Sequence, residues 1–360
     1  IFLRFDTKGV DSNTSPIFLN FITNIFINLY FELQLSSQKK NSKINLVFEI
    51  LKNAILMLYK INFPHHLFIM KNIAIVCAKG IGDGLTWMII AHQLYLNKYN
   101  VVVYSDVLNE ISDWFPKVKI KKNPKNILEF NSYDTVLSDD HSIATKQEKK
   151  INTRLIIPRE HFFNRKIQRI NNMHYVLQSY FQISTKSKEN GLTLTYKKEP
   201  EKPYVVIHPT ASNSERNWGR ERFLKVAKTI LNMGYDVSFI MHKSEIKDWN
   251  EVLKYGINLP EFKNLSDTAS YICNASYFIG SDSGLGHLAS NLGVPTVSIF
   301  VRKSHSLNWR PGWSAGIVVS PLNPLPGRYL RQKYWRIFIT PVMVIQAFKK
   351  IQQAKHTNTK

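Results

Sequence analysis

Short apolar runs alternate with amphipathic segments along most of this chain, and the alternation predicts an α/β fold. The apolar runs are rich in Val and Ile, which is typical of strands buried on both faces of a parallel sheet. Strands are predicted at 71–78, 101–105, 118–121, 133–138, 154–158, 204–208, 236–241, 276–280 and 294–300. Residues at helical spacing predict helices at 85–97, 160–181, 222–233, 265–275, 285–292 and 342–351. This order indicates βα units around parallel sheets.

The length and the polar stretches divide the chain into two domains with flanking segments. A chain of 360 residues is long for a single core. The polar, Lys-rich segment 186–202 is predicted to be an interdomain linker. We therefore predict an N-terminal extension at 1–69, one α/β domain at 70–185 and a second at 203–340. A C-terminal helix and tail follow at 341–360.

Residues 1–69 are expected to be a non-catalytic extension of the first domain. The apolar run 17–35 is interrupted by Asn20, Asn24, Asn28 and Glu32, which makes it a poor membrane span. It also lacks the charged start and small-residue cleavage site of a signal peptide. The alternative is an anchor that lies in one face of a membrane. The first strand followed by a ligand-type loop begins at Met70, so we expect 1–69 to be dispensable for activity.

The stretch from Ser281 to Pro295 carries the clearest chemical pattern. Its residues predict a strand, a tight turn, a helix that stops at Gly293, and a further strand. Asp282 or Ser283 stands at the cap of this helix, and Gly284 lets a ligand approach the backbone. The free N–H groups of a helix N-terminus bind anions, so the turn suits a diphosphate.

Two other strand ends carry polar groups suited to a ligand. Asp83 lies in the glycine-rich loop 79–84 after the first strand, where open α/β sheets place their ligands. This loop spells neither a dinucleotide fingerprint nor a P-loop, and capping of the next helix is the alternative role of Asp83. In the loop after strand 204–208, Thr210 and Ser212 offer hydroxyls and Arg216 offers a guanidinium for phosphate. Trp218 is assigned to packing.

At these residues the chain resembles the ADP-heptose:lipopolysaccharide heptosyltransferases, glycosyltransferase family 9. Residues 282–296 match the family pattern D-[ST]-G-x-x-H-L-A-x-x-L-G-x-P-T at every named position. The start at 70–83 resembles M-K-I-L-I-V-x-x-x-x-[ML]-G-D, and 208–218 resembles H-P-x-x-S…K-x-W with Arg216 where Lys is usual. The segment from Ile339 is similar to the terminal I-T-P-x-x-V helix. The resemblance covers about 70–350.

The resemblance implies a GT-B architecture, in which two Rossmann-like domains face a cleft. It implies inverting transfer of heptose from ADP-heptose to the lipopolysaccharide inner core, with Asp83 as the general base on the acceptor side. Asp282 would contact the donor sugar, and Glu245 would hold the nucleotide ribose. The donor diphosphate would be bound by Thr210, Ser212, Arg216, Ser283, Gly284, Leu285, Gly286 and His287. No D-x-D motif occurs, so neither a metal nor another cofactor is expected.

The charge balance indicates an anionic partner. There are 48 Lys and Arg against 26 Asp and Glu, a formal net charge of +22. A bias toward Lys throughout the chain is the alternative explanation. The resemblance gives the charge a use at an anionic membrane surface, with a cytoplasmic enzyme at the cytosolic face of the inner membrane. Cys77 and Cys273 lie in apolar stretches without metal spacing and are expected to be reduced core residues.

The alternative function is a non-catalytic protein that holds a nucleotide-sugar or a nucleic acid. Retention of Asp83, Asp282 and His287 argues against loss of catalysis. The aromatic residues lie in core-like runs, and no nucleic-acid-binding motif is recognisable, so nucleic acid is not expected as a partner.

Overall fold

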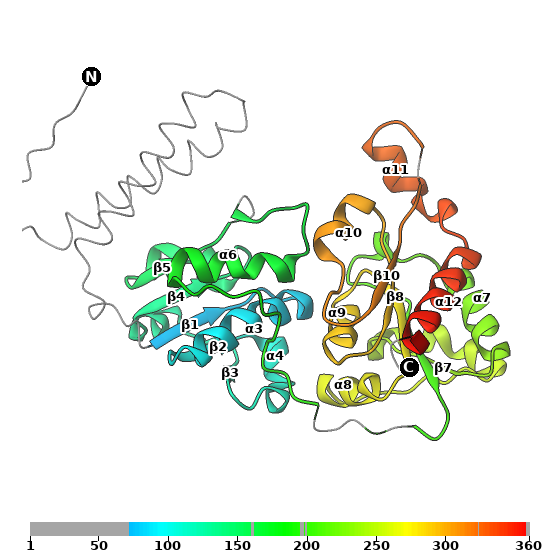
Figure 1. Ribbon diagram of the computed structural model, residues 1–360, viewed down its shortest axis with the longest axis horizontal. Coiled ribbons are helices and arrows are strands. Elements are labelled where there is room, and N and C mark those ends of the chain that lie inside the picture. Colours follow the sequence, from blue (N-terminus) through cyan, green and yellow to red (C-terminus); the bar gives the residue numbers. More distant parts are fainter. Residues whose placement is uncertain (1–71, 160–161, 195–197, 199, 323, 358–360) are drawn as a thin grey trace, which may run out of the picture. The chain divides into compact units, whose positions relative to one another are not determined.

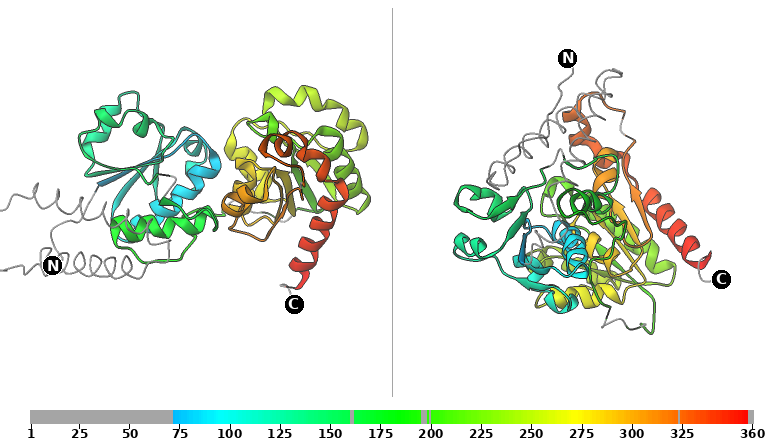
Figure 2. Two further views of the ribbon diagram at one scale, coloured as in Figure 1. Left: turned by 90° about the horizontal axis from the view of Figure 1, so that it is seen from above. Right: turned by 60° about the vertical axis from the view of Figure 1, so that its left-hand side comes forward.

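The computed structural model describes residues 72–159, 162–194, 198, 200–322 and 324–357 (Figures 1 and 2). The prediction for residues 1–69 lies outside these residues. The chain from Met70 to Lys360 forms one compact unit. Within the described residues, no helix is both long enough and apolar enough to cross a bilayer.

The first half of this unit is a five-stranded parallel sheet in the order β3-β2-β1-β4-β5. Its strands are β1 (Asn72–Val76), β2 (Asn100–Tyr104), β3 (Lys119–Lys121), β4 (Thr135–Ser138) and β5 (Arg154–Ile156). Its helices are α3 (Ile81–Leu96), α4 (Asp106–Asn109), α5 (Ile143–Lys146) and α6 (Arg169–Phe181), with 3₁₀ turns η1 (Ser112–Trp114), η2 (Ile127–Ser132) and η3 (Glu148–Lys150). The apolar residues of central β1 are completely buried, as expected of a strand covered on both faces.

The second half repeats this plan with the strand order β10-β9-β8-β6-β7, again all parallel. Its strands are β6 (Tyr204–His208), β7 (Asp236–Phe239), β8 (Tyr277–Ser281), β9 (Thr296–Ile299) and β10 (Gly316–Val319). Its helices are α7 (Arg220–Asn232), α8 (Leu265–Cys273), α9 (Gly284–Asn291), α10 (Lys303–Trp309), α11 (Arg328–Tyr334) and α12 (Pro341–Thr357). The 3₁₀ elements are η5 (Ser214–Arg216), η6 (Lys243–Tyr255) and η7 (Trp335–Phe338). Strand β8 is central and is buried along its whole length.

The predicted fold class is therefore confirmed, since all the predicted strands form and lie in two parallel α/β sheets, which β10 completes. Cys77 and Cys273 are buried free cysteines, as expected from their apolar surroundings. In the described part of the linker, 186–194, 198 and 200–202, there is no helix or strand.

Two predicted helix starts are wrong. Helix α3 begins at Ile81, so Asp83 lies in its first turn and not on a flexible loop. Gly82 and Gly84 belong to this helix, and close packing explains the glycine at 84, since a Cβ there would lie 2.9 Å from Leu108 Cγ. The helix predicted at 160–181 begins only at Arg169.

Sequence patterning also missed several elements of the second half. Strand β10 is an edge strand of four residues with a partly exposed surface, so it lacks a continuous apolar run. Element η6 and helices α10 and α11 were not predicted. In Figure 1, α11 lies on an excursion that leaves the end of β10 and returns to α12.

Candidate functional site

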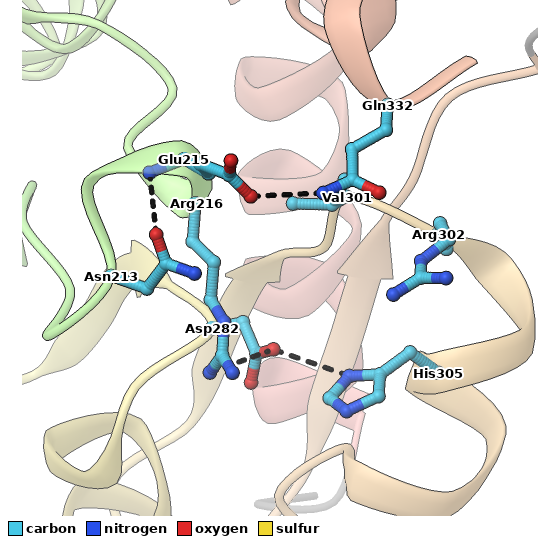
Figure 3. Close-up of a pocket in the computed structure, with 8 residues that line it drawn as sticks. All are labelled: Asn213, Glu215, Arg216, Asp282, Val301, Arg302, His305 and Gln332. Atoms are coloured by element: carbon cyan, nitrogen blue, oxygen red, sulfur yellow. Dashed lines mark hydrogen bonds and ion pairs between the residues drawn. The ribbon is translucent and has the colours of Figure 1, made fainter. Parts of the chain in front are cut away.

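A polar pocket lies beside the ends of β8 and β9 (Figure 3). Its volume is about 120 Å³. It is lined by Asn213, Glu215, Arg216, Asp282, Val301, Arg302, His305 and Gln332. Two of these residues, Arg216 and Asp282, were predicted to bind the donor.

The Asp282 carboxylate is the centre of this pocket. It directly follows β8, is only 9% exposed, and its backbone N–H donates to the Ile299 carbonyl at 3.0 Å. Its Oδ2 lies 3.7 Å from Arg216 Nη1 and 3.2 Å from His305 Nδ1 (Figure 3). A carboxylate this far removed from water needs such partners, and both come from other elements.

His305 is a pocket residue that the sequence analysis missed. It lies on α10, which follows β9 at the same sheet edge as Asp282 follows β8. The signal was present, because Arg302, Lys303 and His305 follow a predicted strand directly. Strand ends at one edge of a parallel sheet collect ligand groups.

The loop that carries Arg216 is held from behind by η7. Arg336 Nε donates to the Asn217 carbonyl at 2.6 Å, and its Nη2 donates to the carbonyls of Ser214 at 3.2 Å and Glu215 at 3.0 Å. The indole N–H of buried Trp335 also donates to the Glu215 carbonyl, at 3.2 Å. These bonds fix the backbone on both sides of Arg216.

Two further contacts complete the support of this loop. Gln332 Nε2 donates to Glu215 Oε2 at 2.9 Å, so α11 reaches the pocket wall itself. Trp218 is completely buried and donates to the Ile339 carbonyl at 3.1 Å. Its assignment to packing agrees with this position.

The N-terminus of α9 is the predicted diphosphate turn. Ser283 is the N-cap residue, but its side chain makes no capping bond, and its Oγ is buried without a hydrogen-bond partner. The Gly286 N–H bonds the Ser283 carbonyl at 3.2 Å, within the turn. Gly284 and Leu285 are partly exposed. A free hydroxyl on this first turn is suited to an anion's oxygen.

His287 lies behind this turn as a neutral, buried ring. It is 5% exposed, and burial lowers its pKa to about 4. It hydrogen-bonds the Trp309 backbone, and its Nδ1 has no partner. At neutral pH this ring therefore offers a hydrogen bond and no positive charge.

Thr210 and Glu245 form a separate pair. The Thr210 hydroxyl donates to Glu245 Oε2 at 3.1 Å, and the His242 N–H donates to the same oxygen at 3.1 Å. Glu245 thus closes the capping box of η6. The predicted ribose acid and the predicted phosphate hydroxyl meet each other, while Ser212 lies exposed on the loop.

Asp83 lies at the carboxyl end of β1, in the first turn of α3. The N-cap of this helix is Gly80, with no side-chain capping bond, so Asp83 is not the N-cap residue. Burial, followed by the nearby charge of Asp139, raises the pKa of Asp83 to about 6. Arg169 and His141 act in the opposite direction. This is a carboxylate adjusted to exchange protons near neutral pH.

Asp139 is the second acid at this edge, and the sequence analysis missed it. Its Oδ2 accepts from the Trp87 indole N–H at 2.7 Å, and its Oδ1 accepts from the His141 N–H at 2.8 Å. It follows β4 as Asp83 follows β1, and neighbouring parallel strands end side by side. Arg169, which acts on Asp83 from α6, is buried, and its guanidinium lies 3.4 Å from the Phe163 ring centroid.

Close glycine packing joins the first turns of α3 and α9. A Cβ on Gly82 would lie 2.9 Å from His287 Cδ2, and one on Gly284 would lie 2.9 Å from Ile81 Cβ. The residue before Asp83 therefore touches the histidine of the predicted diphosphate turn. No group of three or more His, Cys, Asp or Glu is placed to hold a metal among the residues that the structure describes.

Comparison with known proteins identifies the family and the fold of this chain. The model of glycosyltransferase family 9 (heptosyltransferase) matches residues 141–327. Lipopolysaccharide heptosyltransferase 3 of Escherichia coli is 30% identical over 123 residues, which are 32% of this chain and 35% of that protein. The match thus spans about a third of the length of this curated relative.

Two solved structures share the fold. A glycosyl transferase family 9 protein from Veillonella parvula superposes with a TM-score of 0.60 at 15% identity, covering 80% of this chain and 99% of that one. The E. coli ADP-heptose lps heptosyltransferase II gives 0.60 at 16% identity, covering 80% and 100%.

The two parallel sheets and these neighbours define a fold of the GT-B type. The family model spans more than half of the residues, and the chain belongs to glycosyltransferase family 9. Arg216, Asp282 and His287 lie inside the matched range, whereas Asp83 precedes it.

Replacement of Asp83 by Asn should stabilise the fold above about pH 6. Below the usual pKa of 3.8 the Asp83 carboxyl is protonated in both the folded and the unfolded chain. Between 3.8 and about 6 the unfolded chain releases a proton that the folded chain keeps, so rising pH lowers the stability of the wild type. Neutral Asn escapes this loss. Thermal unfolding of both proteins at pH 4 and pH 8 measures the effect.

The Asn variant should gain melting temperature relative to the wild type at pH 8 and gain much less at pH 4. An equal difference at both values would contradict the raised pKa. The matched control is Asp140→Asn, which removes the acid that follows Asp139 in the sequence.

Proposed function

We propose that this protein is a glycosyltransferase that moves heptose from ADP-heptose to the inner core of lipopolysaccharide, with inversion at the anomeric carbon. The observation that carries the proposal is the pocket in which Arg216 and His305 converge on Asp282, directly before the N-terminus of α9. An arginine, a histidine, an acid and a helix N-terminus together suit a sugar joined to a diphosphate. The names of the family and of its relatives support heptose as the sugar.

The donor half of the reaction is assigned to the second sheet. Arg216 would neutralise charge on the diphosphate as the sugar leaves, and the N–H groups of Ser283, Gly284 and Leu285 would act in the same direction. Asp282, held by Arg216 and His305, would accept hydrogen bonds from the hydroxyl groups of the sugar. Glu245 would bind the ribose hydroxyls of the nucleotide after its hydrogen bond with Thr210 is broken.

The acceptor half is assigned to Asp83. Its raised pKa makes the carboxylate a stronger base than an exposed aspartate, while it is still ionised at neutral pH. Asp83 would take the proton of the acceptor hydroxyl as that oxygen forms a bond to the anomeric carbon. The bond from this carbon to the phosphate oxygen breaks, and ADP leaves with the electron pair.

Substitutions should separate these two roles. Asp83→Asn removes proton acceptance but nearly keeps the shape of the side chain, so kcat should fall roughly 10²- to 10⁴-fold. The dissociation constant of ADP should barely change. Arg216→Ala removes a charge-assisted contact, so both ADP affinity and kcat should fall, the affinity by about tenfold or more.

Turnover and calorimetry of ADP binding, measured on both variants, decide this assignment. Near-normal turnover of Asp83→Asn would show that Asp83 has a structural role only. Wild-type ADP binding by Arg216→Ala would place the diphosphate elsewhere.

Loss of the support behind the Arg216 loop should weaken donor binding without touching the donor. Arg336→Ala removes the bonds to the carbonyls of Ser214, Glu215 and Asn217, so the loop must be ordered again when ADP binds. We expect KM for the donor and the dissociation constant of ADP to rise several-fold, with a smaller change in kcat. Arg328→Ala, in the same segment, is the control for charge. Unchanged ADP binding by folded Arg336→Ala would contradict the role.

Turnover should also be independent of added metal. Arg216 and the first turn of α9 supply positive charge where the diphosphate is proposed to bind. Addition of a chelator should therefore leave kcat within about twofold, a small change on the scale of metal-ion effects. Loss of activity that Mg²⁺ restores would overturn these assignments.

A further inference from the structure

The excursion between β10 and α12 exposes large apolar side chains on one segment. Leu322 is 80% exposed, Tyr329 72%, Ile337 61% and Val342 63%. Leu330 and Tyr334 are also exposed on α11. We call this set, with Arg328, Arg331 and Lys333, the α11 surface. These side chains belong to one stretch of the chain, 322–342, which includes α11, η7 and the start of α12, and exposed apolar groups of this kind indicate an interaction site.

The charged residues of the chain from 283 onward, which includes this surface, have one sign. From residue 283 to residue 360 the sequence has no Asp or Glu, and it has eleven Lys and Arg. The acid that meets this segment is Glu215, from the Arg216 loop, and it accepts a hydrogen bond from Gln332. The charge of the α11 surface therefore favours an anionic partner.

Cations and aromatic rings alternate on α11 itself. Lys333 Nζ lies 5.8 Å from the Tyr329 ring centroid and 5.5 Å from that of Tyr334. Tyrosine suits a membrane interface because one end is apolar and the other is polar. Lysine can keep its ammonium at the headgroups while its stem lies on apolar surface.

This combination favours a lipid surface over a nucleic acid. Nucleic acid would satisfy the cations and would stack on the tyrosines, but it offers nothing to Leu322, Ile337 and Val342. A bilayer with anionic headgroups satisfies both kinds of side chain, through charge at its surface and burial of apolar groups beneath it.

We propose that the α11 surface docks the protein on an anionic phospholipid membrane, beside the donor pocket. The inner side of the same segment, through Gln332, Trp335 and Arg336, holds the loop of Arg216. This inference deepens the proposed function, on which it rests for the nature of the acceptor. The docking places the pocket next to the surface in which a lipid-linked acceptor lies.

Vesicle binding by the full chain tests the docking and measures no sugar transfer. The probes are vesicles of equimolar phosphatidylglycerol and phosphatidylcholine, and vesicles of phosphatidylcholine alone. One variant carries Arg328→Gln, Arg331→Gln and Lys333→Gln, and a second carries Tyr329→Ser and Ile337→Ser. The control carries Lys117→Gln, Lys119→Gln and Lys122→Gln, which removes the same charge from an exposed stretch of the first half.

The wild type and the control should bind the anionic vesicles, and both α11 variants should bind at least about tenfold more weakly. Calorimetry of ADP with each variant shows that the fold is kept. Affinity within about twofold of wild type for both α11 variants would overturn the proposal, as would equal loss in the control. Binding of RNA, abolished by the same variants, with no binding of vesicles would assign the surface to nucleic acid. Vesicle binding together with absent sugar transfer would reject the proposed function and keep the docking.

Discussion

The nearly buried carboxylate of Asp282 is the constraint around which the second half is arranged. An ionised group removed from water is costly unless charged or hydrogen-bonding partners reach it. Here they come from the loop after β6 and from α10 after β9, so the ends of three strands are tied to one point. The same position directly precedes α9, whose first turn has its N–H groups unoccupied by a preceding helical turn. The charged partners of Asp282 and the N-terminus of α9 thus lie at the same point, the end of β8, which is the central strand of the sheet.

Much of this could be predicted from the sequence. The strands were predictable because buried parallel strands need continuous apolar runs, and Tyr204–His208 was predicted to the residue. The motif around Asp282 was predictable because a strand, a glycine turn and a helix occur in immediate succession. What failed was the part of the fold without such runs: short edge strand β10, and the start of α3, where two glycines made a helical turn look like a loop.

The site was harder to predict where two distant segments meet. Nothing in the local pattern shows that Asp139 lies near Asp83, or that His305 contacts Asp282, because each pair forms only when neighbouring strands align. Pairing also changed the meaning of residues that were correctly singled out. Thr210 and Glu245, expected to face a ligand separately, bind each other. Arg169, one of three basic residues within 165–169, is stacked on Phe163 and is buried.

The hold of η7 on the Arg216 loop has a consequence for which residues that loop tolerates. Arg336 and Trp335 contact the carbonyl groups of Ser214, Glu215 and Asn217, which every amino acid possesses. These hydrogen bonds to carbonyl groups therefore do not depend on the side chains at positions 214 and 215, although Glu215 adds a side-chain contact with Gln332. Substitutions at these two positions can therefore change which ligand group is bound beside Arg216. The bonds to the carbonyl groups keep the Arg216 guanidinium in the same place. Binding preference and loop geometry are thus encoded in different parts of the chain.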